Sequence, residues 1–337
     1  MRKKYNAGII GCGHIAKNFH LPAVAKNKNF KIVSAFDPVK KKIIEVKKKF
    51  QIDNIYTDLS KMLHNEKLDV AFIFSPPAKH VDNILSCLKE NLNIFVEKPF
   101  VKKLKEFKLI KKNIRSNTYI QCALHQRFRP ISISIKKLIQ KNVLGEIYFI
   151  NIVHRSFRGI PKQSKSFSSK NSSGGGPLID LGSHYFDLVC WLLNFPKINT
   201  VNCKLFKKVF KKNKSKYFPF NTFNNEEMAV GSINFKNKAL LNFELSYINN
   251  LKRDEIKIEL FGSKGSYIWP EKNYYLSEGN KLKKKKLNSN NKLASDLQIK
   301  DYFLSLNTKK KLNRNLKQYE YIVKLIDQRE DMHIHHI

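Results

Sequence analysis

Short apolar runs alternate with amphipathic segments over the first 124 residues of the chain. Each run is about as long as a buried strand, and the segment after it repeats its apolar positions with the period of a helix. The expected strands are 5–10, 31–36, 55–57, 69–74, 92–96 and 119–124. The expected helices are one that follows the first strand, and then 40–50, 58–63, 80–91 and 102–113. Strands that alternate with helices predict an α/β fold with a parallel, doubly wound sheet.

The pattern changes after residue 124, and we predict two domains, 1–124 and 125–337. In the second, the apolar runs 228–235 and 239–247 flank one short turn, and 256–262 and 265–269 flank another, which is typical of hairpins. One face of such a sheet needs covering, and a homodimer or homotetramer is one way to cover it. The other expected elements are helix 131–140, strand 146–154, a helix from 178 to 192, a basic loop 281–292, and closing helices 294–306 and 316–326.

A glycine-rich turn follows the first strand at once. Its sequence, Gly11-Cys12-Gly13-His14-Ile15-Ala16, has the G-x-G-x-x-A pattern of a dinucleotide-binding turn between a strand and a helix. Gly11 allows the tight turn, and Gly13 lets a pyrophosphate approach the backbone. The phosphates would lie on the helix N-terminus, where free N–H groups favour anions. We therefore expect the cofactor to be bound by residues 11–15, which are Gly11, Cys12, Gly13, His14 and Ile15.

The second strand ends at Asp37, at the spacing expected for the acid that binds the adenosine ribose. Its carboxylate would accept hydrogen bonds from the 2′-hydroxyl and repel a 2′-phosphate, which favours NAD over NADP. Lys40, Lys41 and Lys42 soften that preference and leave NADP open as an alternative. The simpler alternative is that Asp37 is a turn residue at the end of a strand.

Further polar residues follow the third and fourth long strands, namely Ser75-Pro76 and Glu97-Lys98-Pro99. Ligands of doubly wound sheets bind outside the carboxyl ends of the strands, so these residues are expected near the cofactor. Pro99 fixes the backbone after the strand, which holds Lys98 in place to polarise a substrate oxygen. The alternative for Lys98 is a surface lysine in a lysine-rich chain.

A second chemical cluster lies in Gly174-Gly175-Gly176 and the helical segment after it. Asp180 and His184 are four residues apart, so a continuous helix would place them on one face. A carboxylate beside an imidazole is an arrangement for proton transfer. The alternative is a surface helix with an ordinary hydrogen-bonded pair.

Taken in order, four motifs resemble the Gfo/Idh/MocA family of nicotinamide-dependent oxidoreductases. They are the glycine turn 11–16, Ser75-Pro76-Pro77 with His80, Glu97-Lys98-Pro99, and Gly174-Gly175-Gly176 with Asp180 and His184. The resemblance covers nearly the whole chain. It implies an N-terminal Rossmann domain and a C-terminal α+β domain with a large, mostly antiparallel sheet.

The resemblance also implies roles for the matching residues. Lys98 would contact the reacting hydroxyl and His184 would be the acid/base, while Asp180 would position the substrate or His184. Glu97 and His80 would line the cofactor side. Arg127 resembles an arginine of the family that faces the cleft, with a surface ion pair as its alternative.

The segment 155–173 departs from the family. It reads as a basic, polar loop over the active site, and its charges could hold a carboxylate or a diphosphate or could simply be solvated. Many relatives carry a Trp-Arg pair before the glycines, where this chain has Phe167-Ser168. The substrate is therefore less certain than the fold.

The net charge of +37 is not by itself evidence that the protein binds nucleic acid. Only nine of the 64 basic residues are Arg, and the Lys residues are spread along the whole chain rather than clustered with aromatics. That distribution argues against specific nucleic-acid binding, although anionic substrates would be attracted.

Five scattered cysteines predict neither a zinc site nor a disulfide framework, and no metal site is expected. The histidines at 333, 335 and 336 could bind metal adventitiously. The chain shows no cleavage-type signal and no membrane-spanning apolar run, which makes the cytoplasm the default location.

These observations predict a dehydrogenase that transfers a hydride between NAD, or NADP, and a secondary hydroxyl of a sugar, cyclitol or nucleotide sugar. An anionic sugar, such as a nucleotide-linked hexuronic acid, is slightly favoured by the basic loop. The alternative is a cofactor-binding sensor or regulator without catalysis. Loss of the Lys98 or His184 type of residue would mark such a protein, and both are present.

Overall fold

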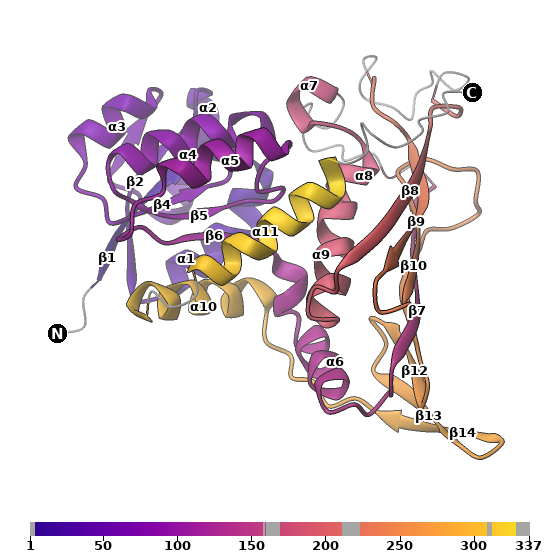
Figure 1. Cartoon of the computed structure of the whole chain (residues 1–337). Helices are drawn as coiled ribbons and strands as arrows, with labels where there is room; N and C mark the ends of the chain where they lie inside the picture. Colours follow the sequence, from indigo (N-terminus) through magenta and orange to yellow (C-terminus); the bar gives the residue numbers. More distant parts are fainter. Residues whose placement is uncertain (1–3, 158, 160–168, 211–222, 309–311, 328–337) are drawn as a thin grey trace. The chain divides into compact units, whose positions relative to one another are not determined.

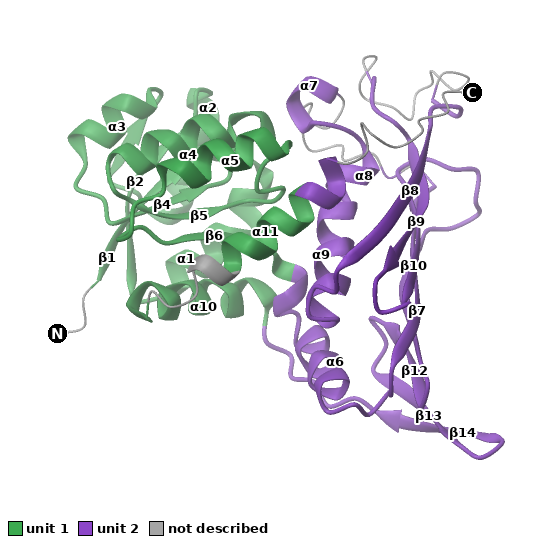
Figure 2. Ribbon diagram, viewed as in Figure 1, with its two compact units in different colours: residues 1–125, 293–323 green, residues 126–292, 324–337 purple. Residues whose placement is uncertain are grey.

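The chain leaves its N-terminal unit and later returns to it. A computed structural model describes all residues except 1–3, 158, 160–168, 211–222, 309–311 and 328–337. One unit comprises residues 1–125 and 293–323, and the other comprises 126–292 and 324–337 (Figure 2). The boundaries drawn from the sequence differ from this division because α10 (Ala294–Thr308) and most of α11 (Leu312–Asp327) belong to the first unit.

The first unit is built on a six-stranded sheet in which every neighbouring pair is parallel (Figure 1). The strands are β1 (Tyr5–Ile10), β2 (Phe30–Phe36), β3 (Asn54–Tyr56), β4 (Val70–Ile73), β5 (Asn93–Val96) and β6 (Ile120–Cys122). Their order, β3-β2-β1-β4-β5-β6, reverses direction between β1 and β4. The predicted doubly wound sheet is therefore confirmed, and β1 and β4 flank the position where such sheets bind ligands.

Helices cover both faces of this sheet. They are η1 (Ala16–His20), α1 (Leu21–Lys26), α2 (Lys40–Phe50), α3 (Leu59–Asn65), η2 (Pro77–Lys79), α4 (His80–Lys89), α5 (Leu104–Asn113), and the returning α10 and α11. Successive strand residues alternate between two buried clusters, as Phe72 and Ile73 do. The strands are thus apolar on both faces, which is why they appear in the sequence as continuous apolar runs.

One aromatic side chain explains why α10 returns. Tyr302 is fully buried, and its ring lies 5.3–6.1 Å from the rings of Phe30, Phe72, Phe95 and Tyr119. Burying an aromatic ring contributes about 1.5–3 kcal/mol, and the Tyr302 hydroxyl, which is buried without a hydrogen bond to the described residues, offsets part of that gain. A contact that spans some two hundred residues leaves no periodic signal in the sequence.

The second unit is built on an eight-stranded sheet (Figure 1). Its strands are β7 (Ile147–Arg155), β8 (Ile198–Phe206), β9 (Met228–Phe235), β10 (Leu240–Ser246), β11 (Glu255–Gly262), β12 (Gly265–Trp269), β13 (Asn273–Glu278) and β14 (Lys281–Lys286). The order is β14-β13-β12-β11-β7-β10-β9-β8, and only the pair β7–β10 is parallel. The predicted mostly antiparallel sheet is confirmed.

The described helices of this unit are η3 (His125–Phe128, whose first residue belongs to the first unit), α6 (Pro130–Gln140), α7 (Lys170–Ser173), α8 (Pro177–Asp180) and α9 (Gly182–Leu192). In Figure 1, α6 and α9 lie along one face of the sheet. Buried side chains on alternate positions of the strands, such as Ile152 on β7 and Phe243 on β10, point to one side. The ring of Phe186 on α9 meets that of Phe243 at 4.9 Å, so this is the helix-covered face.

The expected basic loop 281–292 is corrected at its start, because residues 281–286 form β14 and pair with β13. Neither strand was predicted as such. β14 is an edge strand with Leu282 71% exposed, so it has no buried face to produce an apolar alternation. Lysines on an edge strand also discourage pairing with other chains.

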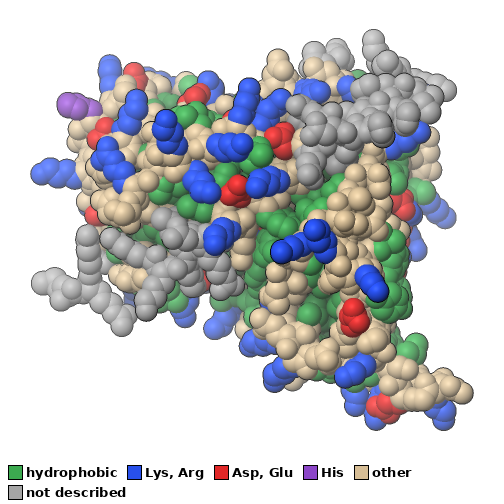
Figure 3. Space-filling view, in the orientation of Figure 1, with side chains coloured by type: hydrophobic (Ala, Val, Ile, Leu, Met, Phe, Trp, Pro, Cys, Tyr) green, Lys and Arg blue, Asp and Glu red, His purple; other side chains and the backbone are tan. Residues whose placement is uncertain are grey.

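The positive charge is dispersed. On the face seen in Figure 3, Lys and Arg side chains are scattered, with Asp and Glu between them. Within the described ranges, no helix combines the length and the apolar character that crossing a bilayer requires.

Candidate active site

The glycine turn after β1 has the shape expected for a dinucleotide cradle. Gly11 has a φ of +95°, and a Cβ there would lie 2.6 Å from the backbone nitrogen of Ser75, so only glycine fits. A Cβ at Gly13 would meet nothing within 4 Å. The backbone at Gly13 therefore borders open space in front of a helix N-terminus, which is where a pyrophosphate would bind.

Asp37 is buried at the end of β2 and holds this turn together. Its carboxylate accepts hydrogen bonds from the backbone N–H groups of Cys12 and Val39, each at 2.9 Å. A carboxylate has about four acceptor positions, so two remain for ribose hydroxyls. Cys12 is itself fully buried, and burial together with Asp37 raises the pKa of its thiol to about 12. Cys12 thus contributes a backbone group to the turn rather than a reactive thiol.

His80 is placed differently from the sequence expectation that it lines the cofactor side. It is fully buried, and its two ring nitrogens lie 2.9 Å from the carbonyl oxygens of Ser75 and Pro99. Burial lowers the pKa of His80, against the opposing effect of those two contacts. With no exposed surface, His80 acts by joining the turn after β4 to the turn after β5. The Ser75 hydroxyl accepts a hydrogen bond from Asn83 at 2.8 Å, which fixes the first of those turns further.

Glu97 is buried beside His20, a histidine that no pattern in the sequence indicates. Its Oε1 lies 2.5 Å from Nε2 of His20, and its Oε2 accepts a hydrogen bond from the backbone N–H of Lys98 at 2.8 Å. Burial raises the pKa of Glu97, but His20 and the charge of Lys98 outweigh that effect and hold the pKa below its usual value. The His20 ring stacks on Phe74 at 4.5 Å. Glu97 and His20 therefore fix the backbone from which the partly exposed Lys98 side chain projects.

In the second unit, the three glycines lead into a buried carboxylate. Gly174 has a φ of +86°, and a Cβ at Gly176 would lie 2.1 Å from the carbonyl oxygen of Glu226, so both positions require glycine. Asp180 follows, 8% exposed, and accepts a 2.6 Å hydrogen bond from the Tyr247 hydroxyl at the end of β10. Burial and then Asp180 raise the pKa of Tyr247 well above its usual value, so the phenol stays a donor.

The helix that carries the predicted Asp180–His184 pair is interrupted. α8 ends at Asp180, Leu181 forms a turn, and α9 begins at Gly182. The chain still keeps helical backbone angles at Leu181, and the backbone N–H groups of His184 and Tyr185 both donate to its carbonyl oxygen. His184 is partly exposed in the first turn of α9, just after the buried Asp180.

A second histidine lies close to this cluster. Nδ1 of His154, on β7, is 2.8 Å from the hydroxyl of Tyr185, and its Nε2 is 3.3 Å from the hydroxyl of Ser156. Burial lowers the pKa of His154, and Asp180 opposes that effect. The polar cluster of the second unit thus comprises Asp180, Tyr247, His154 and Tyr185, and His184 is the chain neighbour of Tyr185.

Arg127 forms an ion pair inside the second unit. Its Nε and Nη2 contact the two carboxylate oxygens of Asp187 at 2.7 and 2.5 Å, and its guanidinium lies over the ring of Phe195. Burial raises the pKa of Asp187, against the opposing effect of Arg127. Arg127 therefore forms a buried ion pair rather than the surface pair given as its alternative, and its role as a substrate ligand stays a prediction.

Most of the predicted basic loop, residues 158 and 160–168, lies outside the described residues, as do the histidines of the tail. Arg155 is described, and it is the last residue of β7. Its guanidinium contacts the carboxylates of Glu244 and Glu255 on the neighbouring strands at 2.7 and 3.1 Å. Arg155, the first basic residue of that predicted loop, is thus paired with two carboxylates. No group of three or more His, Cys, Asp or Glu side chains suited to a metal occurs in the part of the chain that the structure describes.

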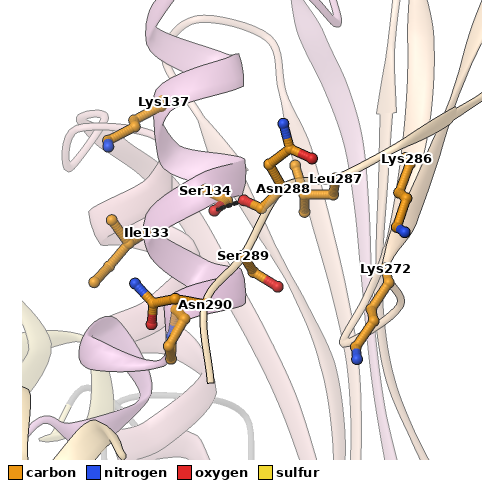
Figure 4. Close-up of a pocket in the computed structure, with 10 residues that line it drawn as sticks. Ile133, Ser134, Lys137, Lys272, Lys286, Leu287, Asn288, Ser289 and Asn290 are labelled. Atoms are coloured by element: carbon orange, nitrogen blue, oxygen red, sulfur yellow. Dashed lines mark hydrogen bonds between the residues drawn. The ribbon is translucent and has the colours of Figure 1, made fainter. Parts of the chain in front are cut away.

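The second unit also has a pocket of about 540 Å³ beside the first turns of α6 (Figure 4). Figure 4 shows Lys286 on β14 and Lys272 just before β13, across from Ser134, whose hydroxyl donates to the carbonyl oxygen of Asn288 at 2.5 Å. None of the predicted site residues lines this pocket. Its lysines are exposed, as are most lysines of this chain, so it is not the candidate active site.

The glycine turn after β1 and the buried Asp37 after β2 together define a dinucleotide-binding protein of the Rossmann class. In this chain, the Rossmann unit is joined to a second unit that contains a cluster of Asp and His side chains. Family models identify it further. The model described as "Oxidoreductase family, NAD-binding Rossmann fold" matches residues 5–123, and "Oxidoreductase family, C-terminal alpha/beta domain" matches residues 136–327. The chain belongs to the Gfo/Idh/MocA family and is an NAD(P)-dependent oxidoreductase of that type.

Individual relatives are distant. The chain is 26% identical over 195 residues to "Oxidoreductase P35" of Formosa agariphila, covering 56% of this chain and 61% of that protein. It is 25% identical over 279 residues to D-glucoside 3-dehydrogenase of Escherichia coli, covering 80% and 79% of the two chains. The solved structure of levoglucosan dehydrogenase with NADH and levoglucosan has a TM-score of 0.83 at 16% identity, with 98% and 97% of the chains covered. That last likeness shows the fold alone.

Proposed function

We propose that this protein transfers a hydride between NAD and a secondary hydroxyl of a sugar, cyclitol or nucleotide sugar. The observation that carries the proposal is the buried hydrogen bond from Tyr247 to Asp180, four residues before the partly exposed His184. A carboxylate held in this way, four residues before a histidine in the chain, suits proton transfer if the two side chains meet at the substrate. The names of the relatives, a glucoside dehydrogenase and a levoglucosan dehydrogenase, support a sugar-type alcohol.

In the proposed reaction, His184 removes the proton from the hydroxyl that is oxidised and returns it in the reverse direction. The Lys98 ammonium stabilises the negative charge that develops on that oxygen. Asp180, kept in place by Tyr247, positions His184 or a substrate hydroxyl. The bound nicotinamide supplies the hydride chemistry.

For the cofactor, we propose that the backbone at 11–15 holds the pyrophosphate and that Asp37 binds the ribose. Asp37 favours NAD, because a 2′-phosphate would lie against a buried carboxylate. Ser75 and Pro76, at the end of β4, would border the nicotinamide half. Glu97, held by His20 and by the backbone N–H of Lys98, would line this half of the cofactor and would position Lys98.

The test is turnover across a panel of free and nucleotide-linked sugars, following the absorbance of reduced nicotinamide. Lys98→Ala and His184→Asn should each lower kcat by at least about 100-fold while NAD still binds. The exposed Lys108→Ala and His64→Asn serve as matched controls and should keep full activity. Full activity in both site variants would refute the mechanism. Binding of NAD by the wild type without turnover of any sugar would favour the sensor alternative.

We also propose that the protein forms a homodimer or homotetramer through the sheet face opposite α9. Phe149 and Phe261 are paired across β7 and β11, with ring centroids 5.8 Å apart, and both are partly exposed. Light scattering after gel filtration tests this proposal. A wild-type monomer, or a Phe149→Asp variant with an unchanged oligomeric state, would contradict it.

A further inference from the structure

Arg129 is a partly buried cation at the entrance to α6. It occupies the N-cap position of that helix, and its guanidinium lies over the ring of Trp269 at 4.6 Å from the centroid. The indole is itself fixed, because its Nε1 donates to the Ser132 hydroxyl at 3.1 Å in the first turn of the same helix. This contact holds the guanidinium against one wall, and its N–H groups remain for another partner.

No carboxylate pairs with Arg129 among the described residues, and its guanidinium makes no hydrogen bond to them either. The partly buried Arg127 and Arg155 differ in this respect, since they contact Asp187 and the pair Glu244 and Glu255. Burial lowers the pKa of Arg129, so its charge is partly desolvated without the compensation that those two arginines have. An arginine in this state is expected to bind an anion strongly.

The neighbours of Arg129 connect it to the acid–histidine cluster of the same unit. Tyr185, which follows His184 on α9, has its ring 6.3 Å from that of Trp269. Burial raises the pKa of Tyr185, Arg129 lowers it and Asp180 raises it, so both charges act on this one hydroxyl. The same hydroxyl contacts His154 at 2.8 Å. Arg129 and Asp180 thus both act on Tyr185, the residue next to His184.

We propose that Arg129 binds an anionic group of the substrate, a carboxylate or a phosphate, and so selects sugar acids or sugar phosphates over neutral sugars. The inference rests on the proposed function and makes its substrate class more specific. A guanidinium edge offers two parallel N–H donors, which match two oxygens of either group. Arg129 is a specificity-determining residue in this scheme, and Trp269 holds its side chain in place.

The experiment measures binding by calorimetry in the presence of saturating NAD, with D-glucose, D-glucuronate and D-glucose 6-phosphate as probes. The wild type should bind one of the two anions at least about tenfold more tightly than glucose. Arg129→Gln should abolish that preference, and Arg129→Lys, which keeps the charge but not the fork, should retain part of it. The glucuronate and phosphate arms distinguish the two sources of the anion.

The matched control is Arg253→Gln, which removes the same charge from an exposed arginine with no described partner. Because the chain carries a net charge of +37, general attraction of anions would be weakened equally in both Gln variants. Thermal unfolding shows whether each variant is folded. Equal affinity of the wild type for the three probes, or the same loss in Arg253→Gln as in Arg129→Gln, overturns the proposal.

Binding and turnover separate this inference from the proposed function. A preference for an anion that depends on Arg129, without turnover of any sugar, would contradict the dehydrogenase and leave the Arg129 site standing. Turnover of neutral sugars with kcat/KM values equal to those of their acids would support the dehydrogenase and contradict the Arg129 site.

Discussion

The buried pair of Arg127 and Asp187 allows two roles for Arg127 to be separated by one substitution. The side chains are 11% and 1% exposed and share two charge-assisted hydrogen bonds. Arg127→Met keeps an apolar stem of similar length but leaves the Asp187 carboxylate buried without its partner. Breaking one side of a buried ion pair costs about 3–5 kcal/mol, because the remaining charge is uncompensated.

For a unit of this size, that cost corresponds to a melting temperature lowered by about 6–20 °C. Differential scanning calorimetry or circular dichroism measures the shift. Arg155→Met is the matched control, since Arg155 also pairs with carboxylates, those of Glu244 and Glu255, but these side chains are 30–37% exposed. Pairs that water reaches contribute about 0–1 kcal/mol, so this variant should melt within a few degrees of the wild type.

The pH dependence of the shift provides a second check. Burial raises the pKa of Asp187, so the folded protein holds that proton more tightly than the unfolded chain does. The penalty in Arg127→Met is therefore present at neutral pH and is lost as the pH falls toward the ordinary value of 3.8. Adding Asp187→Asn should likewise recover much of the stability. An Arg127→Met protein with an unchanged melting temperature and a strongly raised KM would refute this reasoning and establish Arg127 as a substrate ligand.

Three further outcomes are expected. Gly13→Ala should leave the melting temperature unchanged and weaken the binding of NAD at least about tenfold in a fluorescence titration, because its Cβ meets no protein atom. Gly11→Ala should lower the melting temperature, because its Cβ meets the backbone of Phe74 and Ser75. Because the pKa of Glu97 is lowered in the fold, its ionised form stabilises the protein above about pH 4.5, and this stabilisation is lost as the pH falls. Glu97→Gln should therefore make the melting temperature less dependent on pH in the acid range. The control Glu146→Gln, at an exposed position, should not change that dependence. Lys136 donates hydrogen bonds to the carbonyl oxygens of Trp191 and Leu192 and to the Asn194 side chain, which caps the end of α9. Lys136→Met should therefore lower the free energy of unfolding, measured in urea, by about 1–3 kcal/mol. An unchanged free energy of unfolding would contradict this capping role.

The parts of the fold that could be predicted from the sequence are those whose burial is local and repetitive. The central strands β1, β4 and β5 of the first sheet are evident because both of their faces are covered, so each appears as an apolar run next to an amphipathic helix. β14 was missed because an edge strand exposed on both sides has no apolar alternation. The return of α10 was missed because the burial of Tyr302 depends on rings from distant strands.

The candidate site divides in the same way. Gly11 and Asp37 can be identified in the sequence because each directly follows a predicted strand, and their expected roles depend on that position. His20 and Tyr247 do not, because they meet Glu97 and Asp180 across 77 and 67 residues, and an isolated polar residue in an apolar segment carries no mark of its partner.

Arg127 and Arg129 show where spacing stops being informative. They stand two residues apart in one motif, and nothing local distinguishes them. Among the described residues, Asp187 on α9 gives a carboxylate to the first, whereas the second has the aromatic face of Trp269 on β12. The arginine that the motif suggests for the substrate is therefore already engaged within the protein, while its neighbour still has its N–H edge available to an anion.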